Sequence, residues 1–263
     1  ALVGGVFEDG LFDGNGAALN AQGAAFSISG SYFFRNRCAG TTLLPPQSGG
    51  AIYARNSTIW ISVSTFTKNR ADLGGALYIT ARSYVDIHST AFTSNTASSI
   101  KQAKGGAVFI GGSSSVRVTQ STFVDNLAFS TEQMASMYEW HRSALEEVPT
   151  KSSVGGAVCI DQGSLHVGRS TFTSNVAVFG WSIFAGRQEI HLDTDEDSET
   201  ADATLDLRSC SFTANDSYAE YLDDWERLYE FSRYYSGYAK EDVVLSSGAR
   251  GAIVNTTFTP FSV

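Results

Sequence analysis

The sequence predicts an all-β protein, a right-handed parallel β-helix with about three strands per coil, on the strength of three repeated features. The first is the tetrapeptide Gly-Gly-Ala followed by Ile, Leu or Val, which begins at Gly49, Gly74, Gly105 and Gly155. The second is Phe-x-x-Asn, at Phe12, Phe33, Phe66, Phe92, Phe123, Phe172 and Phe212. The third is an apolar alternation before the Phe. Self-similarity at a period of about 20 to 50 residues is typical of solenoids.

The alternation identifies one strand of each coil. Five and seven positions before six of the Phe residues the side chain is apolar, while the residue between varies: Ser27, Trp60, Asp86, Arg117, His166 and Asp206. A period of two indicates a β-strand whose variable position faces solvent. Gly-Gly-Ala is expected to lead into a first strand and Ser-Thr-Phe-Thr into a third. The shortest spacings, 21 residues from Phe12 to Phe33 and 26 from Phe66 to Phe92, suit three short strands.

The repeated residues are interpreted as scaffold. Gly-Gly supplies a turn in which φ can be positive, Phe rings stack inside, and Asn side chains form a ladder that satisfies turn backbone groups. A phosphate-binding loop is not supported, because no Lys-Ser/Thr follows the Gly pairs. Three cysteines, Cys38, Cys159 and Cys210, imply no disulfide framework, and the last two are expected to pack as small hydrophobic residues.

We expect one domain over residues 1–263, with insertions at about 37–48, 96–104, 127–154, 186–204 and 216–246. Capping patterns predict two short α-helices, at 131–147 after Ser130-x-x-Gln133 and at 217–236 after Ser217-x-x-Glu220. Their apolar faces are expected to pack on the coils. Their aromatic side chains are also the candidates for contact with a partner, namely Tyr138, Trp140, Tyr221, Trp225 and Tyr229.

A metal site has weak support in the sequence. The insertion at 186–204 is acidic, and its side chains include candidate Ca²⁺ ligands, Asp193, Asp195 and Asp197. The spacing is not that of an EF-hand, so a solvated acidic loop is favoured. Four His residues at irregular spacing and no C-x-x-C pair give zinc no support. No cofactor is therefore expected.

Charge and hydropathy exclude two classes of partner. Eighteen Lys and Arg residues oppose 27 Asp and Glu residues, for a net charge of -9, and the basic residues are scattered. No nucleic-acid footprint is expected. No apolar run reaches the about 18 residues of a membrane-spanning helix. The chain begins at Ala1, which suggests a processed product or a piece of a longer polypeptide.

Catalytic constellations are sparse. Asp86, His88 and Arg117 form the best cluster for a carbohydrate lyase, but a surface ion pair is favoured. Asp86 and Asp206 occupy equivalent outward positions several coils apart, which is too far for a pair of hydrolytic carboxylates. No G-x-S-x-G motif is present. No residue is assigned a catalytic role, and the chain is not expected to be an enzyme.

Two surface features add further candidates. Thr residues flank the repeated Phe, as in Thr65/Thr67 and Thr171/Thr173, and a flat Thr array resembles the ice-binding face of some insect antifreeze solenoids. Good strand propensity explains the same residues. N-x-S/T triplets mark glycosylation candidates at Asn56, Asn215 and Asn255.

The combination of Gly-Gly-Ala-Ile/Leu/Val with Phe-x-x-Asn resembles the chlamydial polymorphic membrane proteins, surface autotransporters whose passenger domains are right-handed β-helices. Full pairs occur at Gly49/Phe66, Gly74/Phe92, Gly105/Phe123 and Gly155/Phe172, while Gly180-Trp181-Ser182-Ile183 and Asn15-Gly16-Ala17-Ala18 are degenerate first elements. The autotransporter barrel pattern is absent here. The resemblance implies a secreted, non-catalytic adhesin.

The leading hypothesis is therefore an extracellular or cell-surface structural or adhesive module, part of a larger surface protein or filament. Its expected partners are proteins, a second copy along the solenoid axis, or glycans. The first alternative is a carbohydrate-active enzyme of the pectin-lyase-like fold, which predicts a charged cluster in a groove. The second is ice binding, which predicts a bare, flat Thr face.

Overall fold

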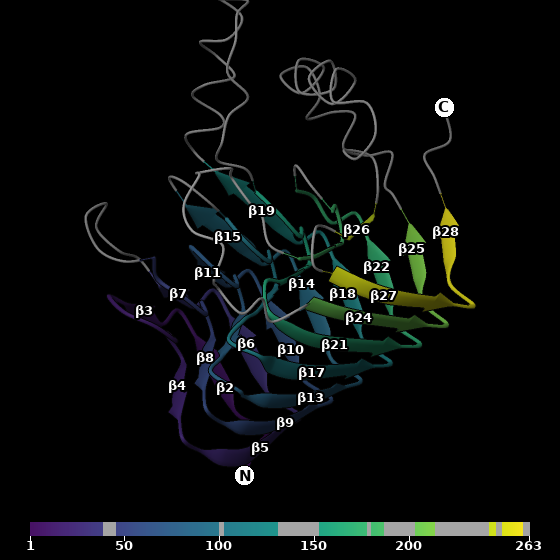
Figure 1. The fold of residues 1–263 in the computed structure, drawn as a ribbon. Helices are drawn as coiled ribbons and strands as arrows, with labels where there is room; N and C mark the ends of the chain where they lie inside the picture. The colour runs from purple at the N-terminus through teal and green to yellow at the C-terminus, as the bar shows by residue number, and fades with distance from the viewer. Residues whose placement is uncertain are drawn as a thin grey trace, which may run out of the picture.

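The computed structural model describes residues 1–38, 46–99, 103–130, 153–177, 180–186, 203–213, 242–245 and 249–259. Every regular element in these ranges is a β-strand, and the strands pair in parallel in four sheets (Figure 1). The prediction of an all-β parallel β-helix is confirmed. The helices expected at 131–147 and 217–236 and the acidic loop lie outside the described residues, and within them no helix is long and apolar enough to cross a membrane.

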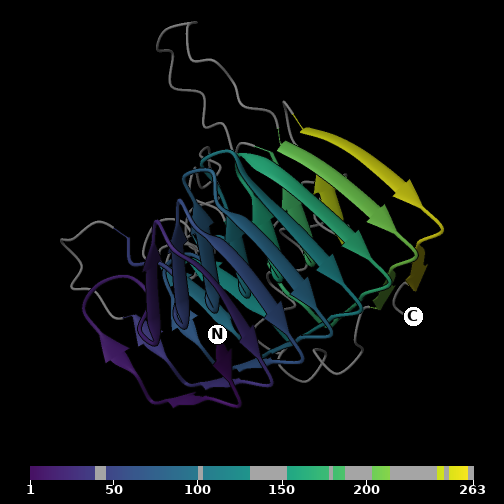
Figure 2. The ribbon, with the colours of Figure 1, turned by 90° about the horizontal axis from the view of Figure 1, so that it is seen from below.

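Two sheets contribute a strand to every coil. Sheet A carries the predicted apolar alternation and contains β1 (Leu2–Val3), β5 (Ala25–Ser29), β9 (Thr58–Ser62), β13 (Tyr84–His88), β17 (Ser114–Thr119), β21 (Gly163–Gly168), β24 (Ala203–Arg208) and β27 (Ala249–Val254). Sheet B carries the Thr-Phe-Thr segments and contains β2 (Val6–Glu8), β6 (Tyr32–Phe34), β10 (Thr65–Thr67), β14 (Ala91–Thr93), β18 (Thr122–Val124), β22 (Thr171–Thr173), β25 (Ser211–Thr213) and β28 (Thr257–Thr259). The coils stack in chain order (Figure 2).

The other two sheets are shorter. Sheet D follows Gly-Gly-Ala and contains β4 (Leu19–Gln22), β8 (Ile52–Arg55), β12 (Leu77–Thr80), β16 (Val108–Ile110), β20 (Val158–Ile160), β23 (Ile183–Ala185) and β26 (Val243–Leu245). Sheet C follows the Asn and was not expected; it contains β3 (Leu11–Phe12), β7 (Arg37–Cys38), β11 (Arg70–Ala71), β15 (Thr96–Ser99) and β19 (Leu127–Ser130). Strands thus open the ranges 37–48, 96–104 and 127–154 that were expected to be insertions.

A column of Phe rings runs through the interior beneath sheet B. Consecutive rings from Phe7 to Phe258 lie nearly parallel, with centroids 4.6 to 5.0 Å apart. The spacing follows the strand separation, since in-register parallel pairing sets equivalent residues about 4.8 Å apart. Ile, Val and Leu from sheets A and D complete one continuous core around the rings. The core therefore extends along the whole stack.

A buried ladder of Asn residues joins sheets B and C. Asn36, Asn69, Asn95, Asn126 and Asn175 stack, each following a residue with positive φ, as at Lys68 and Ser94. The Nδ2 group of Asn95 donates to the carbonyl of Phe66 at 2.9 Å and to Oδ1 of Asn126 at 3.0 Å. Its Oδ1 accepts from the backbone N–H of Asn69 at 3.0 Å. The ladder satisfies buried backbone groups at the corner, as predicted.

Glycine is required at the two positions of Gly-Gly-Ala for different structural reasons. Gly105 has a φ of +66°, in the left-handed region that favours glycine. Gly106 has no such requirement, but a Cβ there would meet the carbonyl oxygen of Gly156 in the next coil. The first glycine therefore permits the turn, and the second permits the close approach of adjacent coils.

The first coil corrects two expectations. Phe7, not Phe12, pairs in register with Phe33 and stacks on it, while Phe12 pairs with Cys38 in sheet C and is 48% exposed. The first spacing is therefore the 26 residues between the paired Phe7 and Phe33 rather than 21.

Gly10 stands where the ladder Asn would be and donates its N–H to Asn36 Oδ1 at 3.2 Å. Gly16, with a φ of +73°, takes the first-glycine position, so the degenerate tetrapeptide is Gly16-Ala17-Ala18-Leu19.

Candidate functional site

The outward face of sheet A carries side chains of varied chemistry. Its apolar residues point inward and are buried, as Val85 and Ile87 are. The position between them runs through consecutive strands as Ser27, Trp60, Asp86, Arg117, His166, Asp206 and Ala252. The expectation that this position faces outward is confirmed. Residues 26 to 49 positions apart in the chain thereby become neighbours on one surface.

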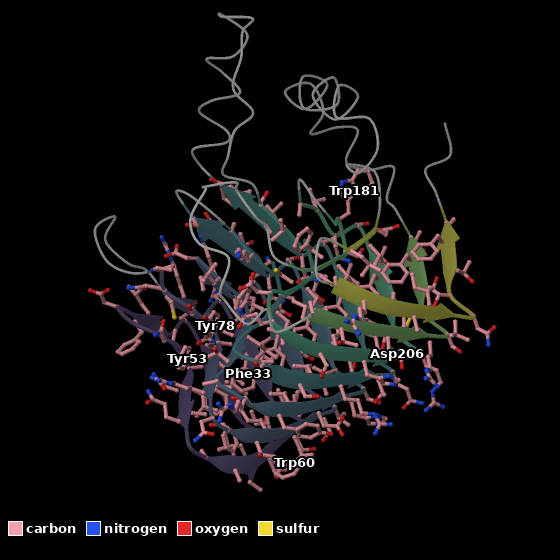
Figure 3. All side chains as sticks on the ribbon, viewed as in Figure 1. Phe33, Tyr53, Trp60, Tyr78, Trp181 and Asp206 are labelled. Carbon is pink, nitrogen blue, oxygen red and sulfur yellow. The ribbon has the colours of Figure 1, made fainter. Side chains whose placement is uncertain are left out.

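A shallow hollow of about 330 Å³ lies on this face over β9, β13 and β17. It is lined by Trp60, Ile61, Ser62, Asp86, His88, Arg117 and Thr119. The Trp60 residue is 47% exposed and stands out from the sheet (Figure 3). The structure thus brings Asp86, His88 and Arg117 together, as the sequence suggested, and adds an indole ring. The sequence placed Trp60 outward but did not name it among the partner-binding candidates.

The polar groups of the hollow are only partly paired. His88 Nδ1 lies 3.0 Å from Thr119 Oγ1, and Ser62 Oγ donates to Ser29 Oγ at 3.1 Å. Asp86 and Arg117 face each other across adjacent strands, yet among the described residues no ion pair within 4.0 Å joins them. The expected surface ion pair is therefore not formed. The carboxylate and the guanidinium keep their hydrogen-bonding capacity for water or a ligand.

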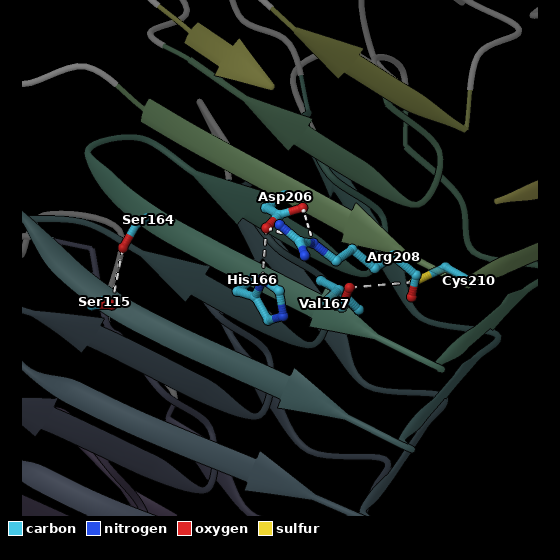
Figure 4. A network of polar contacts seen from close by, with 7 residues as sticks. All are labelled: Ser115, Ser164, His166, Val167, Asp206, Arg208 and Cys210. Carbon is cyan, nitrogen blue, oxygen red and sulfur yellow. Dashed lines mark hydrogen bonds and ion pairs between the residues drawn. The ribbon is translucent and has the colours of Figure 1, made fainter. Parts of the chain in front are cut away.

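A second polar cluster lies on the next two strands of sheet A, β21 and β24 (Figure 4). His166 Nδ1 lies 2.9 Å from Asp206 Oδ2, and Arg208 Nε donates to both Asp206 oxygens at 3.1 Å. The hydrogen bond from Arg208, followed by that from His166, lowers the pKa of the Asp206 carboxyl below its ordinary value. Here the charges are paired with one another. The Asp206 carboxylate is thus already bonded to Arg208 and His166, whereas Asp86 and Arg117 in the hollow form no ion pair with a described residue.

The two carboxylates on the outward face of sheet A do not fit a hydrolytic pair. Asp86 and Asp206 are separated by three steps along sheet A, through Arg117 and His166. At about 4.8 Å per strand the gap is about 14 Å, beyond the about 5 to 10 Å that hydrolytic pairs use. In the part of the chain that the structure describes, no group of three His, Cys, Asp or Glu residues is placed to hold a metal ion. The candidates Asp193, Asp195 and Asp197 lie outside that part.

The cysteines are buried free thiols in the described residues. Burial raises the pKa of the Cys38 thiol to about 11 and that of Cys159 to about 12. Both stay protonated at neutral pH and are poor nucleophiles. Cys159 pairs in register with Phe109, and Cys210 belongs to the main core, so the prediction that these two are packed hydrophobic residues is confirmed.

The remaining candidates divide between the described and undescribed parts. Asn56 and Asn255 are exposed turn residues with φ near +48°, so both are accessible for glycosylation. Asn215 lies outside the described residues. The same holds for the partner-binding candidates Tyr138, Trp140, Tyr221, Trp225 and Tyr229.

The outward face of sheet B aligns threonines. Pairing in register sets Thr65, Thr122, Thr171 and Thr257 in one file, interrupted by Ala91 and Ser211. The second file contains Thr67, Thr93, Thr173, Thr213 and Thr259, interrupted by Val124. The alignment expected from the sequence is present, with these three interruptions.

Comparison with known proteins gave no relatives: no family model matches the chain, and no curated protein or solved structure matches it significantly.

Proposed function

We propose that this chain is a non-catalytic structural or adhesive β-helix module, located outside the cell or on its surface, that contacts partners through the outward faces of its coils. The main support is a contrast within each coil. The interior is filled by stacked Phe rings, whereas the outward face of sheet A presents a different side chain in each coil. Such a stack presents a broad, rigid surface to a partner.

The chemistry of the described residues supports this proposal over the enzyme alternative. The carboxylates of sheet A are too far apart for hydrolysis, and Asp206 is already held by Arg208 and His166. The Asp86, His88 and Arg117 cluster lies in a shallow hollow rather than a groove that encloses a chain. The motif resemblance to autotransporter passengers points to the same class and supplies the proposed location.

The two ends of the stack support association along the axis. Large apolar side chains lie exposed at one end, including Val3, Val6 and Leu11, and at the other, including Ile253 and Phe258. Their strands lie at the edges of sheets A, B and C, and edge strands pair readily with further strands. We propose that a further β-helix segment, of this or a second chain, packs on these ends.

Adhesion is tested with beads that carry the chain at controlled density. Beads bearing the wild-type chain are expected to adhere to cultured epithelial cells, and beads bearing the Trp60→Ala variant are expected to adhere less. Adhesion equal to that of albumin-coated beads would contradict the proposal. Release of unsaturated sugar ends from pectin or alginate, followed by ultraviolet absorbance, would favour the lyase instead.

Ice binding is retained as a second candidate because of the aligned Thr files on sheet B. Ice binding can be tested separately from adhesion through sheet A, because the outward face of sheet B presents hydroxyl and methyl groups in place of charges. Thermal hysteresis that disappears in a Thr171→Lys, Thr173→Lys variant would select this function. The outward residues of sheet A are not involved, so the Trp60 variant would serve as the matched control.

A further inference from the structure

We infer that the hollow beside Trp60 binds a neutral carbohydrate, one or two sugar rings of a larger glycan, with a sugar ring stacked on the indole. This inference rests on the proposed function and names the class of ligand for its adhesive surface. The occupant follows from the aromatic face, the polar groups beside it, their charge and the size of the hollow.

The indole supplies the apolar part of the site. The residues directly opposite Trp60 are Ser27 on β5 and Asp86 on β13, neither of which is aromatic, while Tyr84 and His88 occupy the diagonal positions of β13. Trp60 is 47% exposed. An aromatic face is electron-rich and attracts positively polarised hydrogens. The C–H groups on one face of a pyranose ring are such hydrogens, and their flat arrangement matches an indole.

The groups next to the indole supply the polar part. Ser62, Asp86, His88, Arg117 and Thr119 border the hollow with both donors and acceptors. His88 and Thr119 are tied to each other through Nδ1 and Oγ1 at 3.0 Å, which fixes the histidine ring. Asp86 and Arg117 form no ion pair within 4.0 Å with any described residue. An acceptor and a donor set side by side can bind neighbouring hydroxyl groups, each of which both donates and accepts.

Charge and size narrow the ligand further. Asp86 and Arg117 carry opposite charges that cancel, and the chain as a whole has a net charge of -9. A sulfated or otherwise polyanionic glycan would require a cluster of cations, which the hollow does not have. Its volume of about 330 Å³ is at the low end of small-molecule sites, which suits one or two sugar rings rather than a folded partner.

Binding is tested by saturation-transfer NMR on the full chain with maltotriose, cellotriose, chitotriose, mannotriose and lactose as neutral probes and a heparin hexasaccharide as the polyanionic probe. At least one neutral probe is expected to bind. Trp60→Ala is expected to weaken its affinity about tenfold or more, since a tenfold change corresponds to about 1.4 kcal/mol, within the range of an aromatic anchor. Asp86→Asn and Arg117→Gln are expected to give smaller losses.

Tyr84→Ala is the matched control, because Tyr84 is 38% exposed on the same face but does not line the hollow. Its affinity is expected to equal that of the wild type, and circular dichroism checks that each variant is folded. The inference is overturned if no neutral probe binds, if heparin alone binds, or if Trp60→Ala binds as tightly as the wild type. Adhesion of beads without glycan binding would remove this inference and leave the proposed function standing.

Discussion

The interior and the outward face of sheet A occupy the same coils and follow opposite rules. Inside, one residue type recurs from Phe7 to Phe258 and another from Asn36 to Asn175. Outside, the corresponding position changes at almost every strand. Parallel stacking in register sets each side chain beside its counterpart in the next coil, so identical apolar or amide groups reinforce one another whereas identical charges would repel. In the coils of sheet A, repetition therefore marks packing, and variation marks where a specific contact with a partner can form.

The largest effect is expected from breaking the Phe column. Phe92 is fully buried between Phe66 and Phe123, with ring centroids at 5.0 and 4.8 Å. The Phe92→Ala substitution removes the ring contacts with Phe66 and Phe123 and leaves a cavity. We expect it to lower the free energy of unfolding by about 3 to 5 kcal/mol. Urea denaturation followed by circular dichroism measures the change.

Trp60→Ala, in a neighbouring coil, is the comparison for that experiment. Because Trp60 is exposed, its removal is expected to change the free energy of unfolding by about 0.5 kcal/mol or less. Equal losses at the two positions would show that the interior and the outward face do not differ in the way the structure indicates.

An intermediate effect is expected from the Asn ladder. Asn95→Leu keeps the volume but removes the acceptor for the backbone N–H and Nδ2 of Asn69, and the donor to the carbonyl of Phe66. The groups left unpaired are buried, and we expect a loss of about 2 to 4 kcal/mol. Asn20→Leu, at an exposed position of β4, serves as the control and is expected to cost about 0.5 kcal/mol or less. Comparable melting temperatures for the two variants would argue against the ladder as a source of stability.

The same contrast explains what the sequence could predict. The strands of sheets A, B and D were predictable because burial of one face produces alternation and because Phe recurs. Sheet C was not, since strands as short as Arg37–Cys38 or Arg70–Ala71 contain too few residues to alternate. The first coil was placed wrongly because Gly10 replaces the ladder Asn after Phe7, while Phe12 happens to precede Asn15 by three residues.

The hollow illustrates a different limit. Its residues come from three coils, and the sequence aligned Trp60, Asp86 and Arg117 at one position without any shared chemistry to connect them. A pattern search finds what repeats, and these residues do not repeat. The sequence groups Asp86 with Arg117, and the structure adds the indole of Trp60, which borders the same hollow.

The smallest effect is expected from the charged pair on the outward face. The pKa of Asp206 is lowered in the folded protein, mainly by Arg208, so on acidification the unfolded chain takes up a proton before the folded one does. The stabilisation is therefore complete above the ordinary carboxyl pKa of about 3.9 and is lost as the pH falls through the lowered value. The melting temperature of the wild type is expected to exceed that of Asp206→Asn above that range, and the difference to shrink below it. In an Arg208→Gln background the difference should depend less on pH. A difference that grows on acidification would contradict the assigned pairing.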